Sequence, residues 1–270
     1  MSTTTTAPSP PATTQSRRTR MEPIRKASLV AGVLYLITFV SIPTLALYSR
    51  VHKVGYIASG GSNTGVIVGG ILELIVALAG IGTAVALFPV VKKQNEVVAM
   101  GFVASRILEG ATILVGVACL FTLVTLRRDG AGTDTLVTGH ALVVMYDRTF
   151  LLGQSIMPAV NGLLLGSLMY RSRLVPRVLP LLGLIGAPLL IFAQLGVLGD
   201  LWGRTSSATA ILALPIAAWE FSLGVYLVVK GFRPSAVDRL AVRPDPTWFG
   251  FPATEAASAQ ATTVEQAPRR

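Results

Sequence analysis

The sequence predicts an all-α protein, a polytopic transmembrane helical bundle with six transmembrane helices. Of its 270 residues, 52% are hydrophobic and only 13% are charged, and the mean hydropathy is +0.64. Soluble domains carry about 25% charged residues. The charges also collect at the two ends of the chain and between long apolar runs. Lipid is therefore the expected solvent for most of the chain.

Six apolar runs are each long enough to cross the hydrocarbon core, which takes roughly 20 residues of helix. The first run follows Arg25 and Lys26 and has no convincing signal-peptide cleavage site, so we expect it to remain as the first helix. Backbone groups in lipid must be paired within the segment, and the runs lack the alternation of barrel strands, which favours helices. The predicted spans cover residues 27–48, 65–91, 97–126, 136–170, 178–198 and 208–230.

The spans differ in how readily each would insert alone. A charge at the bilayer centre costs about 2.5–3.5 kcal/mol, and each Leu, Ile or Val returns roughly 0.3–0.6 kcal/mol. The second and sixth spans can therefore insert with one acid each, Glu73 and Glu220. The third carries Arg106 and Glu109 among small and polar residues, so it is expected to need partner helices. Prolines at positions 43, 89, 158, 180, 188 and 215 are expected to cap or kink the helices.

The composition outside the spans divides the chain into three parts. Residues 1–24 and 234–270 are rich in Thr, Ser, Pro and Ala, which is typical of disorder. We expect one membrane domain over residues 25–233 between two disordered cytoplasmic tails.

Lys and Arg are distributed unequally between the two ends of the predicted bundle. Sixteen lie on the side that holds both termini and five on the opposite side. This bias predicts that both termini are cytoplasmic. The basic residues flank apolar segments and form no dense stripe, which argues against nucleic acid as a partner. The expected partners are the lipid bilayer and the anionic lipid headgroups on the cytoplasmic side.

Polar residues inside the spans mark a candidate intramembrane site. Small residues at helical spacing surround Glu73, Glu109 and Glu220, which places these acids on helix-packing faces. Asp147 and the polar residues seven and fourteen positions later form one stripe down the fourth span. The candidate site comprises Glu73, Arg106, Glu109, Asp147, Arg148, Gln154, Asn161 and Glu220.

Depth along the helices sorts the charged residues into two predicted clusters. The inner cluster joins Arg106 to Glu109 and Glu220, and the outer cluster joins Glu73 to Arg148, with Asp147 as a further member. Acids outnumber bases by one in each, so one carboxyl in each is expected to be protonated. Alternatively, Asp147 and Arg148 lie at the water interface, because the fourth span is overlong.

Several kinds of chemistry are not expected. His52 and His140 fall near span ends, so a haem or zinc site in the membrane core is disfavoured. The single cysteine, Cys119, excludes an intramolecular disulfide and a cysteine-based metal cluster. No P-loop or dinucleotide fingerprint occurs. We expect no cofactor and no metal, and an enzyme is the least favoured class.

Several stretches resemble a known family. They are the AGVLYL of the first span at 31–36, RILE at 106–109, the segment from Tyr146-Asp147 to Gly166, YRS at 170–172, PRVL at 176–179, WEF at 219–221 and LVVKG at 227–231. Together they resemble the bacterial six-span membrane family catalogued as domain of unknown function 4386, over about residues 25–233. The resemblance implies one six-helix domain in the bacterial plasma membrane and no known activity. The residues that match its pattern are Arg106, Glu109, Asp147, Pro176, Arg177 and Glu220.

Two functional interpretations stay open from the sequence. The first is a multi-pass membrane protein whose polar intramembrane site serves transport or the binding of a small molecule or a proton. The alternative is a structural or interaction membrane protein whose buried charges only stabilise helix packing. A water-accessible cavity touching Glu73, Glu109 or Glu220 would favour the first, and tight dry ion pairs would favour the second.

Overall fold

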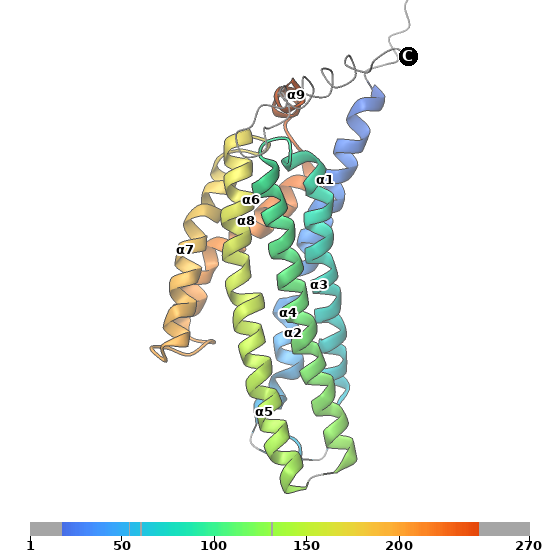
Figure 1. Ribbon diagram of the computed structural model, residues 1–270, viewed down its shortest axis with the longest axis vertical. Helices are drawn as coiled ribbons and strands as arrows, with labels where there is room; N and C mark the ends of the chain where they lie inside the picture. Colours follow the sequence, from blue (N-terminus) through green and yellow to red (C-terminus); the bar gives the residue numbers. More distant parts are fainter. Residues whose placement is uncertain (1–17, 54, 60, 131, 243–270) are drawn as a thin grey trace, which may run out of the picture.

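The computed structural model describes residues 18–53, 55–59, 61–130 and 132–242, and most of the two predicted tails lies outside these residues. In this part of the chain all regular structure is helical. Six helical segments are long and apolar enough to cross a membrane, and they run side by side along the long axis (Figure 1). The predicted all-α bundle of six transmembrane helices is confirmed.

The six segments are built from eight α-helices, with two shorter helical turns between them. In chain order the elements are α1 (Arg18–Thr38), α2 (Ser41–Tyr48), the 3-10 turn η1 (Ser49–His52), α3 (Thr64–Val91), α4 (Glu96–Asp129), α5 (Thr133–Phe150), the π-helix η2 (Leu151–Ile156), α6 (Met157–Ser172), α7 (Val178–Leu198), α8 (Ser207–Val229) and α9 (Pro234–Val242). The first segment combines α1, α2 and η1, and the fourth combines α5, η2 and α6.

Helix extends into both regions where the sequence suggested disorder. α1 begins at Arg18, ahead of the predicted first span, and α9 occupies residues 234–242. α9 forms because it is amphipathic: Ala236 and Leu240, one turn apart, are both buried against the main core. The Arg233 N–H donates to the carbonyl of Leu174 at 2.9 Å, which holds the start of α9 against the α6–α7 connection.

Pro43 breaks the first segment in the middle of the bundle. Proline has no N–H to donate to the carbonyl of Phe39, four residues earlier. That carbonyl instead accepts from Ile42 N at 3.1 Å, and Val40 N donates to Ile37 O at 3.0 Å. The 3-10 type bonds end α1 at Thr38 and start α2 at Ser41. Before the break the segment packs on both α3 and α8, and after it the segment packs mainly on α3.

The fourth segment contains the π-helix η2 directly before Pro158. Pro158 has no N–H to donate to the carbonyl of Gln154, four residues earlier, and a wider turn of helix precedes it. A π-helix holds more residues per turn than an α-helix, so side chains on either side of η2 lose the seven-residue register. The polar residues expected to form one stripe along this segment therefore point in different directions before and after η2.

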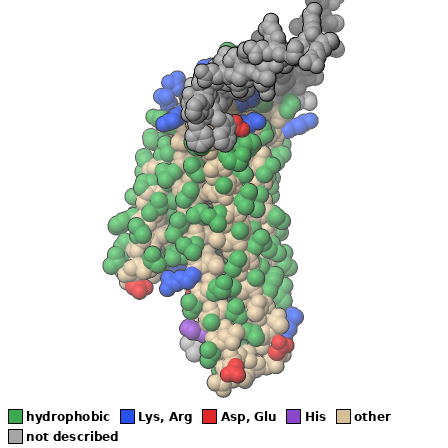
Figure 2. Space-filling view, in the orientation of Figure 1, with side chains coloured by type: hydrophobic (Ala, Val, Ile, Leu, Met, Phe, Trp, Pro, Cys, Tyr) green, Lys and Arg blue, Asp and Glu red, His purple; other side chains and the backbone are tan. Residues whose placement is uncertain are grey.

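Helix packing follows a simple order around the bundle. α1 lies between α3 and α8, α3 packs on α4, and α6 joins α4 to α7, which pairs with α8. α2 packs mainly on α3. Large apolar side chains such as Leu78, Ile211 and Leu214 are exposed on the outside, and apolar side chains cover much of the visible face (Figure 2). Such a surface is expected where the solvent is lipid.

The two ends of the bundle differ in charge and in shape. The end that holds α9, here the α9 end, also carries the basic connections α3–α4 and α6–α7, and basic side chains gather there (Figure 2). At the opposite end α4 and α5 extend well beyond the α7–α8 connection (Figure 1). α4 has 34 residues and α7 has 21, so this difference in length leaves a ridge on one side of the opposite end.

Candidate functional site

Arg106 on α4 is the centre of a buried polar cluster. Its Nη1 lies 3.0 Å from Glu109 Oε2, and its Nη2 lies 3.0 Å from Glu220 Oε1 on α8. Nη2 also donates to the Tyr35 hydroxyl of α1 at 3.1 Å. Asn161 Nδ2 on α6 donates to Glu109 Oε2 at 2.8 Å. These five residues, the Arg106 cluster, connect four of the six segments.

Most of the charged and polar atoms in the Arg106 cluster have an ion-pair or hydrogen-bond partner. A buried ion needs a charged partner and further hydrogen bonds, because desolvation costs several kcal/mol per ion. Ser105 Oγ donates to Asn161 Oδ1 at 2.6 Å, which orients the amide toward Glu109. Among the described residues, Arg106 Nε has no hydrogen-bond partner. The sequence predicted the inner group of Arg106, Glu109 and Glu220, and the structure brings these three side chains together.

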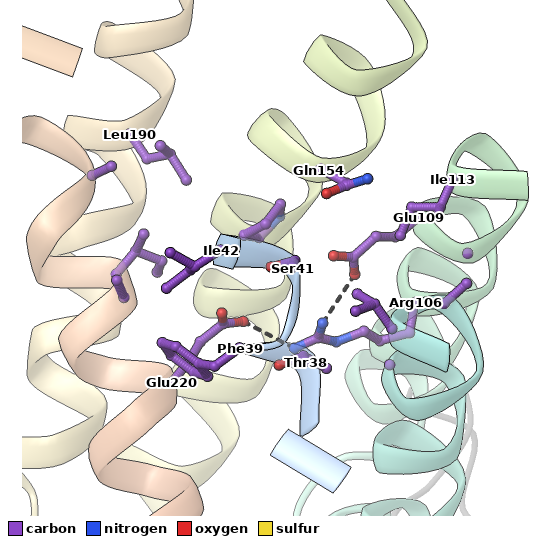
Figure 3. Close-up of a pocket in the computed structure, with 18 residues that line it drawn as sticks. Thr38, Phe39, Ser41, Ile42, Arg106, Glu109, Ile113, Gln154, Leu190 and Glu220 are labelled. Carbon is purple, nitrogen blue, oxygen red and sulfur yellow. Dashed lines mark hydrogen bonds and ion pairs between the residues drawn. The ribbon is translucent and has the colours of Figure 1, made fainter. Parts of the chain in front are cut away.

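A cavity of about 200 Å³ adjoins the cluster. Figure 3 shows the α1–α2 break passing between the Glu220 side and the Glu109 side of this cavity. Its polar lining residues are Thr38, Ser41, Arg106, Glu109, Gln154 and Glu220, and its apolar lining includes Phe39, Ile42, Ile113, Leu190, Ala213 and Ala217. The cavity, called the Arg106 pocket below, is thus lined by both polar and apolar side chains.

The carboxylates, and not the guanidinium, are the charged groups most open to the pocket. The side chains of Glu109 and Glu220 are 12% and 16% exposed, whereas that of Arg106 is 3% exposed. Two carboxylates share one guanidinium, so the lining carries one net negative charge when all three are ionised. Such a pocket attracts a positively charged group or a proton.

Glu73 on α3 forms a separate group with neutral partners. Its Oε1 accepts from Thr44 Oγ1 at 2.5 Å and from the Tyr48 hydroxyl at 3.0 Å, both on α2. Its Oε2 accepts from Gln154 Nε2 at 2.8 Å. The predicted pairing of Glu73 with Arg148 is wrong, because Arg148 is exposed on α5. Among the described hydrogen-bond partners of the Glu73 carboxyl group, Gln154 is the one that also lines the Arg106 pocket.

Asp147 belongs to a third group, which lies where α5 passes the α7–α8 connection. Its Oδ1 lies 3.0 Å from Arg204 Nη1 and 2.9 Å from His52 Nε2. The predicted membership of Asp147 in a cluster with Glu73 is therefore wrong. The cause is the π-helix η2, because of which the side chain of Asp147 points in a different direction from the side chains of Gln154 and Asn161. Asp147 is half-exposed, and its group fastens η1, α5 and the α7–α8 connection to one another.

A second hollow, of about 640 Å³, lies at the opposite end of the bundle. It is mostly apolar and is lined by η1, the following turn and α5, with Lys53, His140 and Asp147 among its polar residues. Of the candidate site residues it reaches only Asp147. Within the part of the chain that the structure describes, no group of three or more His, Cys, Asp or Glu side chains is placed to hold a metal ion.

Sequence reasoning missed the neutral partners of the buried acids. Tyr35, Thr44, Tyr48 and Ser105 all donate to or accept from a candidate site residue. Thr44 and Tyr48 stand one helical turn apart in the first span, which was a usable signal. Arg204 gave no comparable signal, because it lies in a connection whose path depends on the packing of α7 and α8.

Comparison with protein families gives a match over most of the chain. The model of the family described as domain of unknown function (DUF4386) matches residues 30–231, which is most of the chain. No curated protein matches the chain, and no solved structure matches it.

Proposed function

The chain belongs to the DUF4386 family, and from this premise we propose that it is a multi-pass membrane protein that binds a small, positively charged ligand in the Arg106 pocket. The family match agrees with the resemblance seen in the sequence, and the family's description names no activity. The proposal therefore depends on the site.

The observation that carries the proposal is that two carboxylates line the pocket beside a single, more deeply buried guanidinium. An ionised carboxylate in a medium of low dielectric is stabilised by a counter-charge. Arg106 supplies one positive charge, and a cationic group in the pocket would supply the second. An anionic ligand would meet Glu109 and Glu220 before it reached Arg106.

The position of the pocket favours a role in transport or ligand binding over a surface role. Glu220 lies about 20 Å from the first residue of α8 and about 14 Å from the last, at 1.5 Å per residue. The break between α1 and α2 borders the pocket. In many transporters, discontinuous helices form the substrate and ion sites near the bilayer midplane.

We also propose that the protein lies in the bacterial plasma membrane with both termini in the cytoplasm. The support is the set of basic residues at the α9 end. They include Lys92, Lys93, Arg171, Arg173, Arg177, Lys230 and Arg233. Anionic headgroups of the inner leaflet would meet this surface.

Thermal unfolding of the purified protein tests the proposed binding site. A ligand that binds only the native state raises the unfolding midpoint as its concentration increases. We expect ethylammonium or a monovalent metal ion to raise the midpoint, and Glu220→Gln to abolish that rise. Glu220→Gln should still fold, because Arg106 keeps Glu109 and Tyr35 as partners.

Asp134→Asn is the matched control, since it also converts an acid to its amide but lies exposed at the start of α5. The control should respond to cations like the unaltered protein. The proposal fails if no cation shifts the midpoint, or if Glu220→Gln responds as fully as Asp134→Asn.

One observation favours the structural alternative: the Arg106 cluster connects four segments, as register-fixing ion pairs would. Under that alternative Glu220→Gln lowers the unfolding midpoint, and no cation raises the midpoint of either protein. The same set of measurements therefore separates the two functions.

A further inference from the structure

The Arg106 pocket opens sideways, and we infer that its ligand is a single-chain amphiphile with an amine head group that enters from the lipid between α2 and α8. The inference rests on the proposed function and narrows its ligand class. Its three supports are the path of the broken segment, the exposure of the side chains around the opening, and the volume of the pocket.

The opening arises from the break at Pro43. Up to Thr38, α1 packs along α8, but beyond the break α2 packs mainly on α3. The first segment therefore leaves α8 at the level of the pocket. Ile42 of α2 lines one side of the resulting gap, and Ala213 and Ala217 of α8 line the other. Small side chains on α8 keep the gap open.

The side chains around the gap show that it faces lipid. Ile42 is 63% exposed and Leu214, beside Ala213, is 65% exposed. Towards the α9 end the gap is closed by Phe39 and Phe221, whose rings meet edge to face at 5.4 Å. A molecule approaching Glu220 through the gap therefore passes apolar side chains first. This order of contacts suits a ligand that is already dissolved in the bilayer.

The volume of the pocket limits how much of the ligand it can enclose. At about 200 Å³ the pocket is smaller than the roughly 300–1,000 Å³ of sites that bury a drug-sized ligand. It has room for an ammonium head and the first few methylene groups. The rest of an alkyl chain would lie outside, along the exposed faces of α2 and α8. The carboxylates of Glu109 and Glu220 would receive the ammonium group.

Photolabelling in proteoliposomes tests the inference. The probe is dodecylamine with a diazirine near the end of its chain, and the labelled residues are mapped by peptide mass spectrometry. We expect labelling concentrated on α2 and the first half of α8, at least threefold above that on Ile71 and Ile75 of the lipid-facing side of α3. An excess of ethylammonium, or the Glu220→Gln substitution, should reduce the labelling of α2 and α8 to the level seen on α3.

A pair of alanine substitutions provides the matched control. Ala217→Phe places a ring in the pocket, whereas Ala104→Phe places the same ring on the exposed face of α4, away from α2 and α8. We expect the first to abolish the concentrated labelling and the second to leave it unchanged.

The outcomes separate this inference from the proposed function. If α2, α3 and α8 are labelled to the same extent, or if Glu220→Gln leaves the labelling unchanged, the ligand is not an amphiphile. If ethylammonium still raises the unfolding midpoint in that case, the cation site stands and its ligand is a small water-soluble cation. If neither the midpoint nor the labelling responds to an amine, both proposals fail.

Discussion

At the scale of single residues, Arg106 determines whether two acids can lie inside the bundle. It holds Glu109 and Glu220 at 3.0 Å each, although the two side chains come from different helices. The carboxyl group of Glu73 is instead held by three neutral hydrogen-bond donors. The two acids beside Arg106 therefore depend on one cation, whereas the described partners of the Glu73 carboxyl group are all neutral.

Arg106→Gln should destabilise the protein by about 3–5 kcal/mol, because it leaves two buried carboxylates without their counter-charge. The measurement is unfolding of the purified variant and of the unaltered protein in the same detergent. Adding Glu109→Gln and Glu220→Gln to the variant should recover most of the loss, since the charges are then absent. An Arg106→Gln variant as stable as the unaltered protein would contradict the assigned role of the guanidinium.

At the scale of helices, the break at Pro43 and the π-helix before Pro158 create the site. The first directs α2 away from α8 and opens the pocket, and the second turns Gln154 toward Glu73. Gly153 of the π-helix packs so closely on Thr112 of α4 that any added Cβ would overlap the threonine hydroxyl. Each irregularity therefore places a polar group that a straight helix would aim elsewhere.

Pro43→Ala should straighten the first segment, because alanine restores the donor for the carbonyl of Phe39. A straighter segment carries α2 toward α8 and narrows the opening of the pocket. Spin labels at Leu45→Cys and Leu214→Cys, in a Cys119→Ala background, should move closer together in the variant. Pro89→Ala near the end of α3 is the control and should leave that distance unchanged; equal distances in all variants would show that Pro43 does not set the opening.

At the scale of the whole molecule, the sequence was sufficient to predict the six spans and the inner cluster of Arg106, Glu109 and Glu220. It was not sufficient to predict the rest of the candidate site. Apolar runs determine where helices lie, and the depths of Arg106 and Glu220 along their helices match. The contact of Gln154 with Glu73, and the separation of Asp147 from both of them, depend on the π-helix, which shifts the register between positions 147 and 154. Periodicity assumes a regular helix, so it cannot anticipate a local change in residues per turn.

The orientation proposed for the bundle predicts opposite labelling of its two ends. In intact cells, and with Cys119 replaced by Ala, a membrane-impermeant maleimide should label Asp200→Cys in the α7–α8 connection. It should not label Lys93→Cys in the α3–α4 connection until the cells are opened. Labelling of Lys93→Cys in intact cells would reverse the orientation, because the basic end would then face outward.

The ridge at the opposite end has a practical consequence. α4 is about 51 Å long at 1.5 Å per residue, whereas the hydrocarbon core is about 30 Å thick. With the bundle upright in such a core, the surplus of α4 and α5 would stand in water beyond the α7–α8 connection. An antibody fragment raised against this protrusion would add recognisable mass to a small particle for cryo-electron microscopy. It would do so without blocking the gap between α2 and α8.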